Sequence, residues 1–202
     1  SASADDDVMT VATTGDAATA FVISAGNSQG VFKINSAGLI EVASATNLNF
    51  ESTTSYTLTI LAADATGTAD IETVAITITD VNEAAPVFGD GASIAVNVAE
   101  GATTVGTYSA TDADTANTLT YSIVASGTDI NSVDHDLFSI VSGTGALSFA
   151  VAPNYEAPGC GTDNDANVCV VILSVTDSIA GTADDTITVT VTVTNVAIAI
   201  TA

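Results

Sequence analysis

The chain has 202 residues and a formal net charge of -23, since 24 acidic side chains stand against a single basic one, Lys33. This balance excludes nucleic-acid binding, which needs clustered Lys and Arg to meet the phosphates. Apolar residues make up 47% of the chain, but no apolar run approaches the roughly 18 residues of a membrane helix. We therefore expect no membrane insertion, and the length allows one large or two ordinary β domains.

The first half of the chain predicts short strands after an acidic start. Asp5, Asp6 and Asp7 repel one another unless something neutralises them, so we expect residues 1–10 to form a solvated arm. From Thr19 onward apolar residues alternate between turn residues, as in β-strands. The expected strands are AFVIS, GVFKI, LIEVA, YTLTIL and ETVAITIT. No stretch of useful length has the period of a helix.

The second half repeats this order, which indicates two related domains. Its expected strands are SIAVNVAEG, GTYSATDADT, TLTYSIV, DLFSIVSGTGALSFA, VCVVILSVTD and DTITVTVTVTN. Phe21 aligns with Tyr121, and Asp64 aligns with Asp177 after further insertions. We predict an all-β chain of two tandem Ig-like Greek-key β-sandwiches, residues 1–82 and 83–202. The first strand of the second domain, SIAVNVAEG, has no visible counterpart in the first domain, whose first strand is apparently missing.

Alternation also predicts which side chains form the two cores. The inward residues are expected to be Ile23, Phe32, Ile34, Ile40, Leu58, Ile60, Ile76 and Ile78, followed by Tyr121, Ile123, Phe138, Ile140, Leu147, Ile172 and Val189. In the last strand Thr188, Thr190, Thr192 and Thr194 share one face. Such a row is typical of the solvated side of a β-branched strand, with ice or glycan binding as the alternative use.

Two cysteines lie in the loop CGTDNDANVC. We predict a disulfide between Cys160 and Cys169, which places the chain in an oxidising, extracellular setting. Zinc is the weaker alternative, because it needs further Cys or His ligands and the chain has only His135.

Residues 80–88, DVNEAAPVF, separate the two sets of strands and read as a linker. Pro86 lacks a backbone donor, so the preceding ladder must stop there. Asp80 and Glu83 place carboxylates where two domains would meet, which suggests a metal site.

Several motifs around this linker resemble those of cadherin-type repeats, which also occur in large bacterial surface adhesins. DVNEAAPVF is similar to the linker motif Asp-x-Asn-Asp-x-x-Pro, with Glu83 at the second acid. ATDADT, with Asp112 and Asp114, resembles the Asp-x-Asp motif. NFE and NYE, which end at Glu51 and Glu156, resemble the motif that usually reads Asp-x-Glu. Glu100, Asp64 and Asp177 stand where that family has its remaining acids.

The resemblance implies a calcium site between the repeats, because Ca²⁺ takes about six to eight oxygen ligands and a junction can gather them from three segments. The ligands it implies are Glu51 from the first repeat, Asp80, Asn82 and Glu83 from the linker, and Asp112, Asp114, Asn117 and Asp177 from the second repeat. Bound calcium would stiffen the linker, with an affinity of about 10⁻⁴ to 10⁻³ M. Asn49 and Asn154 replace the family's aspartate, so we expect fewer ions than the family usually holds.

The two ends of the chain look complementary. After VTVTNV, where a linker would be expected, the chain continues as AIAITA, which alternates like IAVNVAE. This suggests donor-strand exchange, in which the C-terminal strand of one copy completes the first repeat of the next. Glu100 and Glu156 would then meet Asp16 and Asp64 of the next copy in a second calcium site, with Asp5–Asp7 as substitute linker acids. The alternative is a longer adhesin cut at both ends.

No motif for catalysis is visible. His135 lies between two aspartates with no nucleophile placed beside it, and the absence of Trp argues against a glycosidase cleft. We predict a non-enzymatic, extracellular, calcium-dependent adhesion protein at the cell surface. Its partners would be further copies, arranged head to tail in a filament, or neighbouring repeats of a longer surface adhesin in which it is a spacer. Binding of surface glycans is the remaining alternative.

Overall fold

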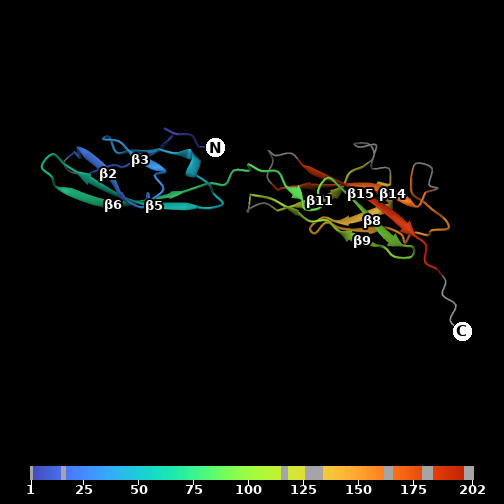
Figure 1. Ribbon diagram of the computed structural model, residues 1–202. Coiled ribbons are helices and arrows are strands. Elements are labelled where there is room, and N and C mark those ends of the chain that lie inside the picture. The colour runs from blue at the N-terminus through green and yellow to red at the C-terminus, as the bar shows by residue number, and fades with distance from the viewer. Residues whose placement is uncertain are drawn as a thin grey trace. The chain divides into compact units, whose positions relative to one another are not determined.

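The computed structural model describes residues 2–14, 17–114, 118–125, 134–161, 166–178 and 184–197. The chain divides into two units, Ser1–Val81 and Asn82–Ala202. Strands make up almost all of the regular structure of both units (Figure 1). Each unit buries one hydrophobic cluster between two sheets. The predicted all-β, Ig-like sandwich fold is confirmed.

Unit 1 consists of two three-stranded antiparallel sheets. Their strand orders are β1-β4-β3 and β2-β5-β6. The elements are β1 (Asp7–Thr10), β2 (Ala20–Ala25), β3 (Phe32–Ile34), β4 (Leu39–Val42), the 3₁₀ helix η1 (Ala45–Asn47), β5 (Ser55–Ala63) and β6 (Ala69–Thr77). Between the sheets lie Val31, Phe32, Ile40, Tyr56, Leu58, Ile60, Val74 and Ile76.

Unit 2 has the strand orders β11-β14-β15-β8 and β12-β13-β9, with a further pair β10-β7. Its elements are β7 (Val87–Phe88), β8 (Ser93–Ala99), β9 (Thr104–Thr107), β10 (Ala110–Thr111), β11 (Thr120–Ile123), the 3₁₀ helix η2 (His135–Leu137), β12 (Phe138–Val141), β13 (Ala146–Phe149), β14 (Val168–Thr176) and β15 (Asp185–Thr194). Its core is centred on β14 and β15, whose alternate residues are fully buried.

The two units share one framework. The N–H of Val11 donates to the carbonyl of Gly38, and the N–H of Tyr108 donates to the carbonyl of Gly145, which matches the strand pair β1-β4 to β9-β13. By the same comparison β2, β5 and β6 correspond to β11, β14 and β15. In unit 2, β8 runs parallel to β15 over seven residues. Among the described residues of unit 1, no strand lies along the equivalent edge of β6.

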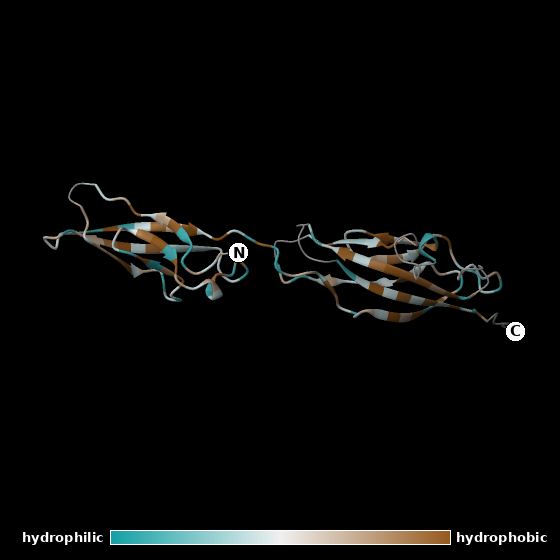
Figure 2. Cartoon of the chain, turned by 90° about the horizontal axis from the view of Figure 1, so that it is seen from above, coloured by the Kyte–Doolittle hydropathy of each residue, from teal (hydrophilic) through white to brown (hydrophobic). Residues whose placement is uncertain are grey.

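Hydropathy alternates along the strands as the sequence predicted (Figure 2). All of the residues expected in the two cores are buried or packed against the buried clusters. Ile172 is buried, at 5% exposed, but it does not belong to the cluster between the sheets, to which its neighbours Val171 and Leu173 contribute. From Val168 to Val175 almost every residue is apolar, so the sequence contains no alternation that would fix the phase. The threonine row of β15 lies on the outer, half-exposed face, as expected.

The N-terminus differs from the expected solvated arm. Residues Asp7–Thr10 form β1, which pairs with β4. Lys33 neutralises Asp5 through a salt bridge, and the N–H of Asp5 donates to the carbonyl of Val42 at 2.8 Å. The segment is solvent-exposed, as expected, but backbone pairing with β4 orders it, and the sole basic side chain compensates one of its three aspartates.

The predicted disulfide between Cys160 and Cys169 is present. Cys169 belongs to β14, and both cysteines are buried. Asp134 lies beside them and is only 4% exposed. Its Oδ1 accepts the N–H of Gly161 and its Oδ2 accepts the N–H of Val170, both at 2.7 Å. The disulfide loop is thus held by one bond between sulfurs and by one buried carboxylate.

Candidate metal centre

Two carboxylates come together at the end of unit 1. Asp80 follows β6 in extended chain, and Glu51 lies in a turn after η1. A carboxylate oxygen of Glu51 lies within 4.8 Å of one of Asp80. Oε1 of Glu51 and both oxygens of Asp80 are shielded from solvent and lack a hydrogen-bond partner. These three carboxylate oxygens therefore have no hydrogen-bond donor to stabilise their negative charge.

The arrangement is costly for a metal-free protein. Two unit charges at 4.8 Å repel by about 3 kcal/mol at an effective dielectric constant of about 20. Buried polar atoms in native proteins are nearly always hydrogen-bonded, and the exceptions need an explanation such as a bound ion. A cation between Glu51 and Asp80 would remove both costs.

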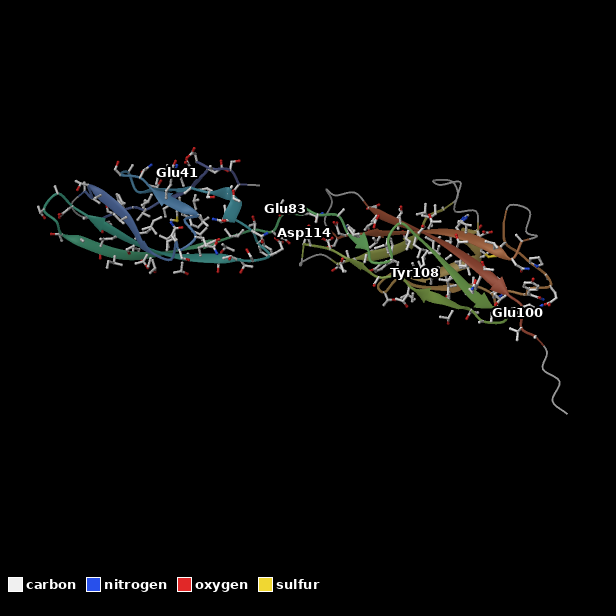
Figure 3. All side chains as sticks on the ribbon, viewed as in Figure 1. Glu41, Glu83, Glu100, Tyr108 and Asp114 are labelled. Carbon is white, nitrogen blue, oxygen red and sulfur yellow. A yellow bond between two sulfur atoms is a disulfide. The ribbon has the colours of Figure 1, made fainter. Side chains whose placement is uncertain are left out.

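The start of unit 2 holds the linker by its backbone. Oδ2 of Asp114 accepts the N–H groups of Glu83 and Ala84, at 3.0 and 2.9 Å. Asp114 is only 3% exposed, and its own N–H donates to Oδ1 of Asp112 at 2.9 Å. The side chain of Glu83 is exposed, so at this position the linker contacts unit 2 through its main chain (Figure 3).

Further oxygens lie at this end of unit 2. The side-chain amide of Asn82 donates to Oδ2 of Asp177 at 2.8 Å. Oδ2 of Asp112 is buried and has no hydrogen-bond partner. Of the ligands predicted for the second repeat and the linker, Asn82, Glu83, Asp112, Asp114 and Asp177 therefore gather here, while Asn117 lies outside the described residues.

The opposite end of unit 2 carries Glu100 and Glu156, which the sequence assigns to a half-site. Glu100 accepts the N–H of Val196 at 2.8 Å and that of Tyr155 at 3.2 Å. These backbone donors, led by Val196, lower the pKa of Glu100 below its ordinary value. Oε1 of Glu156 accepts a hydrogen bond from the amide of Asn195 at 2.8 Å. The two glutamates thus already have donors within unit 2, unlike Glu51 and Asp80.

The other predicted half-site consists of Asp16 and Asp64, and the structure describes only Asp64. Oδ1 of Asp64 accepts the N–H groups of Thr66 and Thr68 and the hydroxyl of Thr66, at 2.8 to 2.9 Å. The hydroxyl of Thr66, followed by these N–H groups, lowers the pKa of Asp64. Asp64 therefore caps the turn between β5 and β6. Asp16 lies outside the described residues.

The chemistry of the donors fits calcium. Every candidate ligand atom at the end of unit 1 and the start of unit 2 is an oxygen, from a carboxylate or an amide. Hard cations such as Ca²⁺ and Mg²⁺ take oxygen ligands, whereas zinc sites usually contain His or Cys. The orphaned oxygens of Glu51, Asp80 and Asp112 are those that a hard cation would bind.

Comparison with known proteins agrees with the fold. The chain matches no protein-family model. It is 38% identical over 136 residues to the protocadherin-like wing polarity protein stan of Drosophila melanogaster, a match that covers 63% of this chain and 4% of that protein. Among solved structures it resembles mouse cadherin-23 EC22-24, with a TM-score of 0.70 and 23% identity over 96% of this chain and 60% of that one. Mouse clustered PcdhgC3 EC1-3 gives a TM-score of 0.63 and 21% identity over 90% and 54% of the two chains.

Both units have the fold of cadherin repeats. The resemblance carried by the short motifs is thereby confirmed at the level of the fold. The chain spans a small part of its curated relative and little more than half of these solved structures. None of the described helices is long and apolar enough to cross a membrane.

Sequence reasoning missed two acids that position segments of unit 2. Asp185 accepts the N–H of Phe88 through Oδ2 at 2.9 Å and so fixes β7 against β15. Asp134 holds the disulfide loop, although its sequence context suggested an exposed turn around His135. Neither acid belongs to a recognisable motif. Their position at the start of a strand or helix next to an apolar run is the one signal that the sequence offers.

Proposed function

We propose that this chain is a calcium-stiffened pair of cadherin-like repeats with a structural or adhesive role outside the cell. The observation that carries the proposal is the set of buried, unpartnered carboxylate oxygens on Glu51, Asp80 and Asp112. Asp80 and Asn82 are separated by one residue, which limits their Cα atoms to about 7 Å. Oxygens from both repeats are therefore available to one calcium site, with Glu83, Asp114, Asn117 and Asp177 as the further ligands we propose.

Three properties support an extracellular structural role over catalysis. The disulfide favours an oxidising compartment, because cytosolic thiols are kept reduced. The solved structures of similar fold are cadherins. The acids gather at the ends of the sandwiches and serve as ligands and caps. The alternative role is that of a spacer within a larger surface adhesin.

Calcium-dependent unfolding tests this proposal. For an affinity of about 10⁻⁴ to 10⁻³ M, calcium at about 10 mM stabilises the folded chain by about 1.4 to 2.7 kcal/mol. For units of this size that corresponds to a rise in Tm of roughly 5 to 15 °C. We expect this rise by differential scanning calorimetry relative to the protein in EDTA. The absence of any rise in calcium would refute the proposal.

Asp112→Asn is the sharpest variant. Its Oδ1 accepts the N–H of Asp114, which asparagine can still do, whereas its Oδ2 has no partner to lose. The metal-free Tm should therefore change little, and the rise in calcium should largely disappear. Asp90→Asn is the matched control, because it removes the same charge from an exposed turn of unit 2. Equal calcium responses in the two variants would exclude Asp112 from the site.

Head-to-tail assembly into a filament is the second function that we propose. It is favoured by the edge of β6, which has no neighbouring strand among the described residues, whereas β15 has β8. A contact between the end of unit 2 and the start of unit 1 of another copy is heterologous and need not close. In this assembly Glu100 and Glu156 of one copy would face Asp16 and Asp64 of the next.

A further inference from the structure

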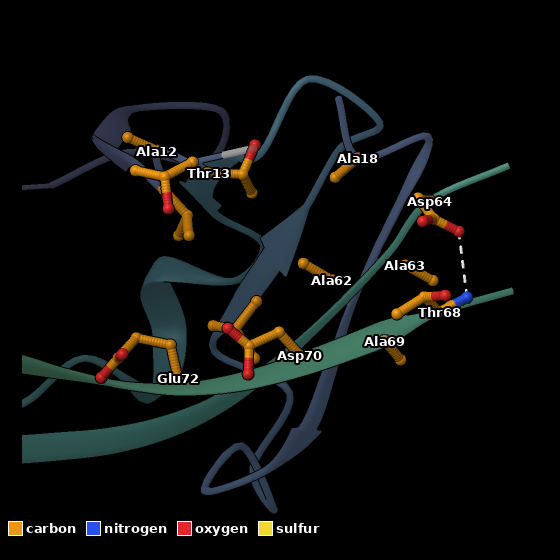
Figure 4. A pocket seen from close by; sticks show the side chains of 13 residues that line it. Ala12, Thr13, Ala18, Ala62, Ala63, Asp64, Thr68, Ala69, Asp70 and Glu72 are labelled. Carbon is orange, nitrogen blue, oxygen red and sulfur yellow. Dashed lines mark hydrogen bonds between the residues drawn. The ribbon is translucent and has the colours of Figure 1, made fainter. Parts of the chain in front are cut away.

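Unit 1 contains an open groove at the start of β6. Its volume is about 400 Å³, and it lies between the end of β5, the start of β6 and the segment after β1 (Figure 4). Its lining combines apolar and small side chains such as Ile60 and Ala62, threonines such as Thr68, and the acids Asp64, Asp70 and Glu72. The groove is therefore partly apolar and carries three carboxylates.

Unit 2 fills the equivalent place with its own chain. Phe88 of β7 is buried there, with its ring centroid 6.1 Å from that of Tyr121. The N–H of Phe88 donates to Asp185, and the N–H of Gly89 donates to the carbonyl of Ser109 at 3.0 Å. β8 then continues along β15. A segment that enters at this point and continues as a strand thus completes the sandwich.

Asp70 corresponds to Asp185 in the strand register. Asp70 pairs with Ala62 on β5, as Asp185 pairs with Val175 on β14. In both acids Oδ1 accepts the N–H of the next residue, at 2.9 Å in Asp70 and 2.8 Å in Asp185. Oδ2 of Asp185 takes the N–H of Phe88, whereas the described residues offer Oδ2 of Asp70 no donor. Asp70 therefore offers the acceptor that Phe88 uses in unit 2, and no strand in the described part of unit 1 uses it.

The edge of β6 is correspondingly less covered. Val74 and Ile76 face the core of unit 1 and are 8% and 9% exposed, whereas Val189 and Val191 in the equivalent positions of β15 are 0% exposed. An uncovered strand edge presents unpaired N–H and C=O groups that can pair with another chain. Glu72 stands where unit 2 has Ile187, so the occupant cannot be acidic at this level.

We propose that the groove and the edge of β6 accept residues 196–202 of a second copy, bound as a strand parallel to β6. Val196, Ile198 and Ile200 alternate with small residues as Ile94, Val96 and Val98 do in β8. The segment has no ionisable side chain, so its side chains add no like-charge repulsion in an acidic groove of a chain with net charge -23. This inference rests on the head-to-tail assembly proposed above and names its acceptor.

The alternation supplies a matched pair of variants in the full 202-residue chain. Ile198→Asp places a carboxylate on the inward face of the donated strand, and Ala199→Asp places the same charge on the outward face. We expect Ile198→Asp to abolish oligomers in sedimentation velocity and filaments in negative-stain images, while Ala199→Asp assembles like the unmodified chain. Equal behaviour of the two variants, with assembly intact, overturns strand donation and leaves head-to-tail assembly standing.

A peptide tests the acceptor without assembly. The probe is the synthetic octapeptide NVAIAITA, titrated by fluorescence anisotropy into the full chain carrying Ile198→Asp and Ile200→Asp, in calcium and in EDTA. We expect NVAIAITA to bind saturably. The peptide NVADAITA, which carries Ile198→Asp, should bind with an affinity at least about 100-fold lower. The affinity of NVAIAITA should fall about tenfold when the acceptor chain carries Asp70→Asn. If the peptide binds to an unmodified chain that remains monomeric, the groove is a strand-binding site but head-to-tail assembly is refuted. No binding of NVAIAITA overturns this inference, and it leaves the calcium proposal untouched.

Discussion

Replacing Asp114 by alanine should release the linker from unit 2 even in the absence of metal. One buried oxygen of Asp114 accepts the N–H groups of Glu83 and Ala84. A hydrogen bond to a charged group contributes about 1.5 to 3 kcal/mol. Because the two bonds share one oxygen, we expect a combined loss of about 3 kcal/mol. That corresponds to roughly 100-fold faster opening of this segment.

Hydrogen exchange followed by mass spectrometry measures this directly. In EDTA, peptides that contain residues 83 and 84 should exchange slowly in the unmodified chain and roughly 100-fold faster in Asp114→Ala. Asp114→Asn should fall between them, since an amide oxygen accepts the same bonds without a full charge. Asp90→Ala serves as the control for a lost charge in unit 2. Unchanged exchange at these two positions in Asp114→Ala would show that the linker is held by something other than this carboxylate.

Two further changes probe unit 2 away from the linker. Asp134→Ala removes two hydrogen bonds at 2.7 Å and should lower the stability of unit 2 by about 3 kcal/mol or more, which corresponds to a fall in Tm of roughly 10 °C in calorimetry. The control Asp136→Ala changes an exposed side chain and should alter the stability of unit 2 by less than about 0.5 kcal/mol. Similar losses of stability in the two variants would contradict the role of Asp134. The pKa of Glu100 is lowered in the folded state. The ionised side chain therefore stabilises unit 2 fully at a pH above the ordinary carboxyl pKa of about 4.3. This stabilisation is lost as the pH falls through the lower pKa of the folded state. The amide resonance of Val196 should therefore titrate below the ordinary carboxyl value, and a transition above that value would show that these hydrogen bonds do not form in solution.

The sequence predicted the sandwiches well because their strands alternate clearly. Strands such as β6 and β15 place apolar residues at every second position, which fixes the inward face. In β14 the alternation is lost because both faces are apolar, so Ile172 is buried but lies outside the cluster between the sheets. The N-terminal strand was not predicted for another reason. It forms by backbone pairing with β4, which lies far along the chain.

The candidate metal centre was predictable to the level of residue types but not of atoms. The motifs named Asp112, Asp114 and Asp177, and these residues do gather at the start of unit 2. Nothing in the motifs indicated that Asp114 would bind the linker backbone or that Oδ2 of Asp112 would remain unpartnered. Such differences depend on the direction of each carboxylate, which tertiary packing decides.

The burial of the disulfide bears on when in the life of the protein it can change. Cys160 is 3% exposed and Cys169 is not exposed at all, so a thiolate in solution has no path to either sulfur. Exchange requires direct attack on a sulfur atom and depends on access. The bond must therefore form before or while β14 packs into the core, and it should persist through later exposure to reductants for as long as unit 2 stays folded. The oxidation state of each molecule thus records the environment in which it folded rather than the one in which it is found.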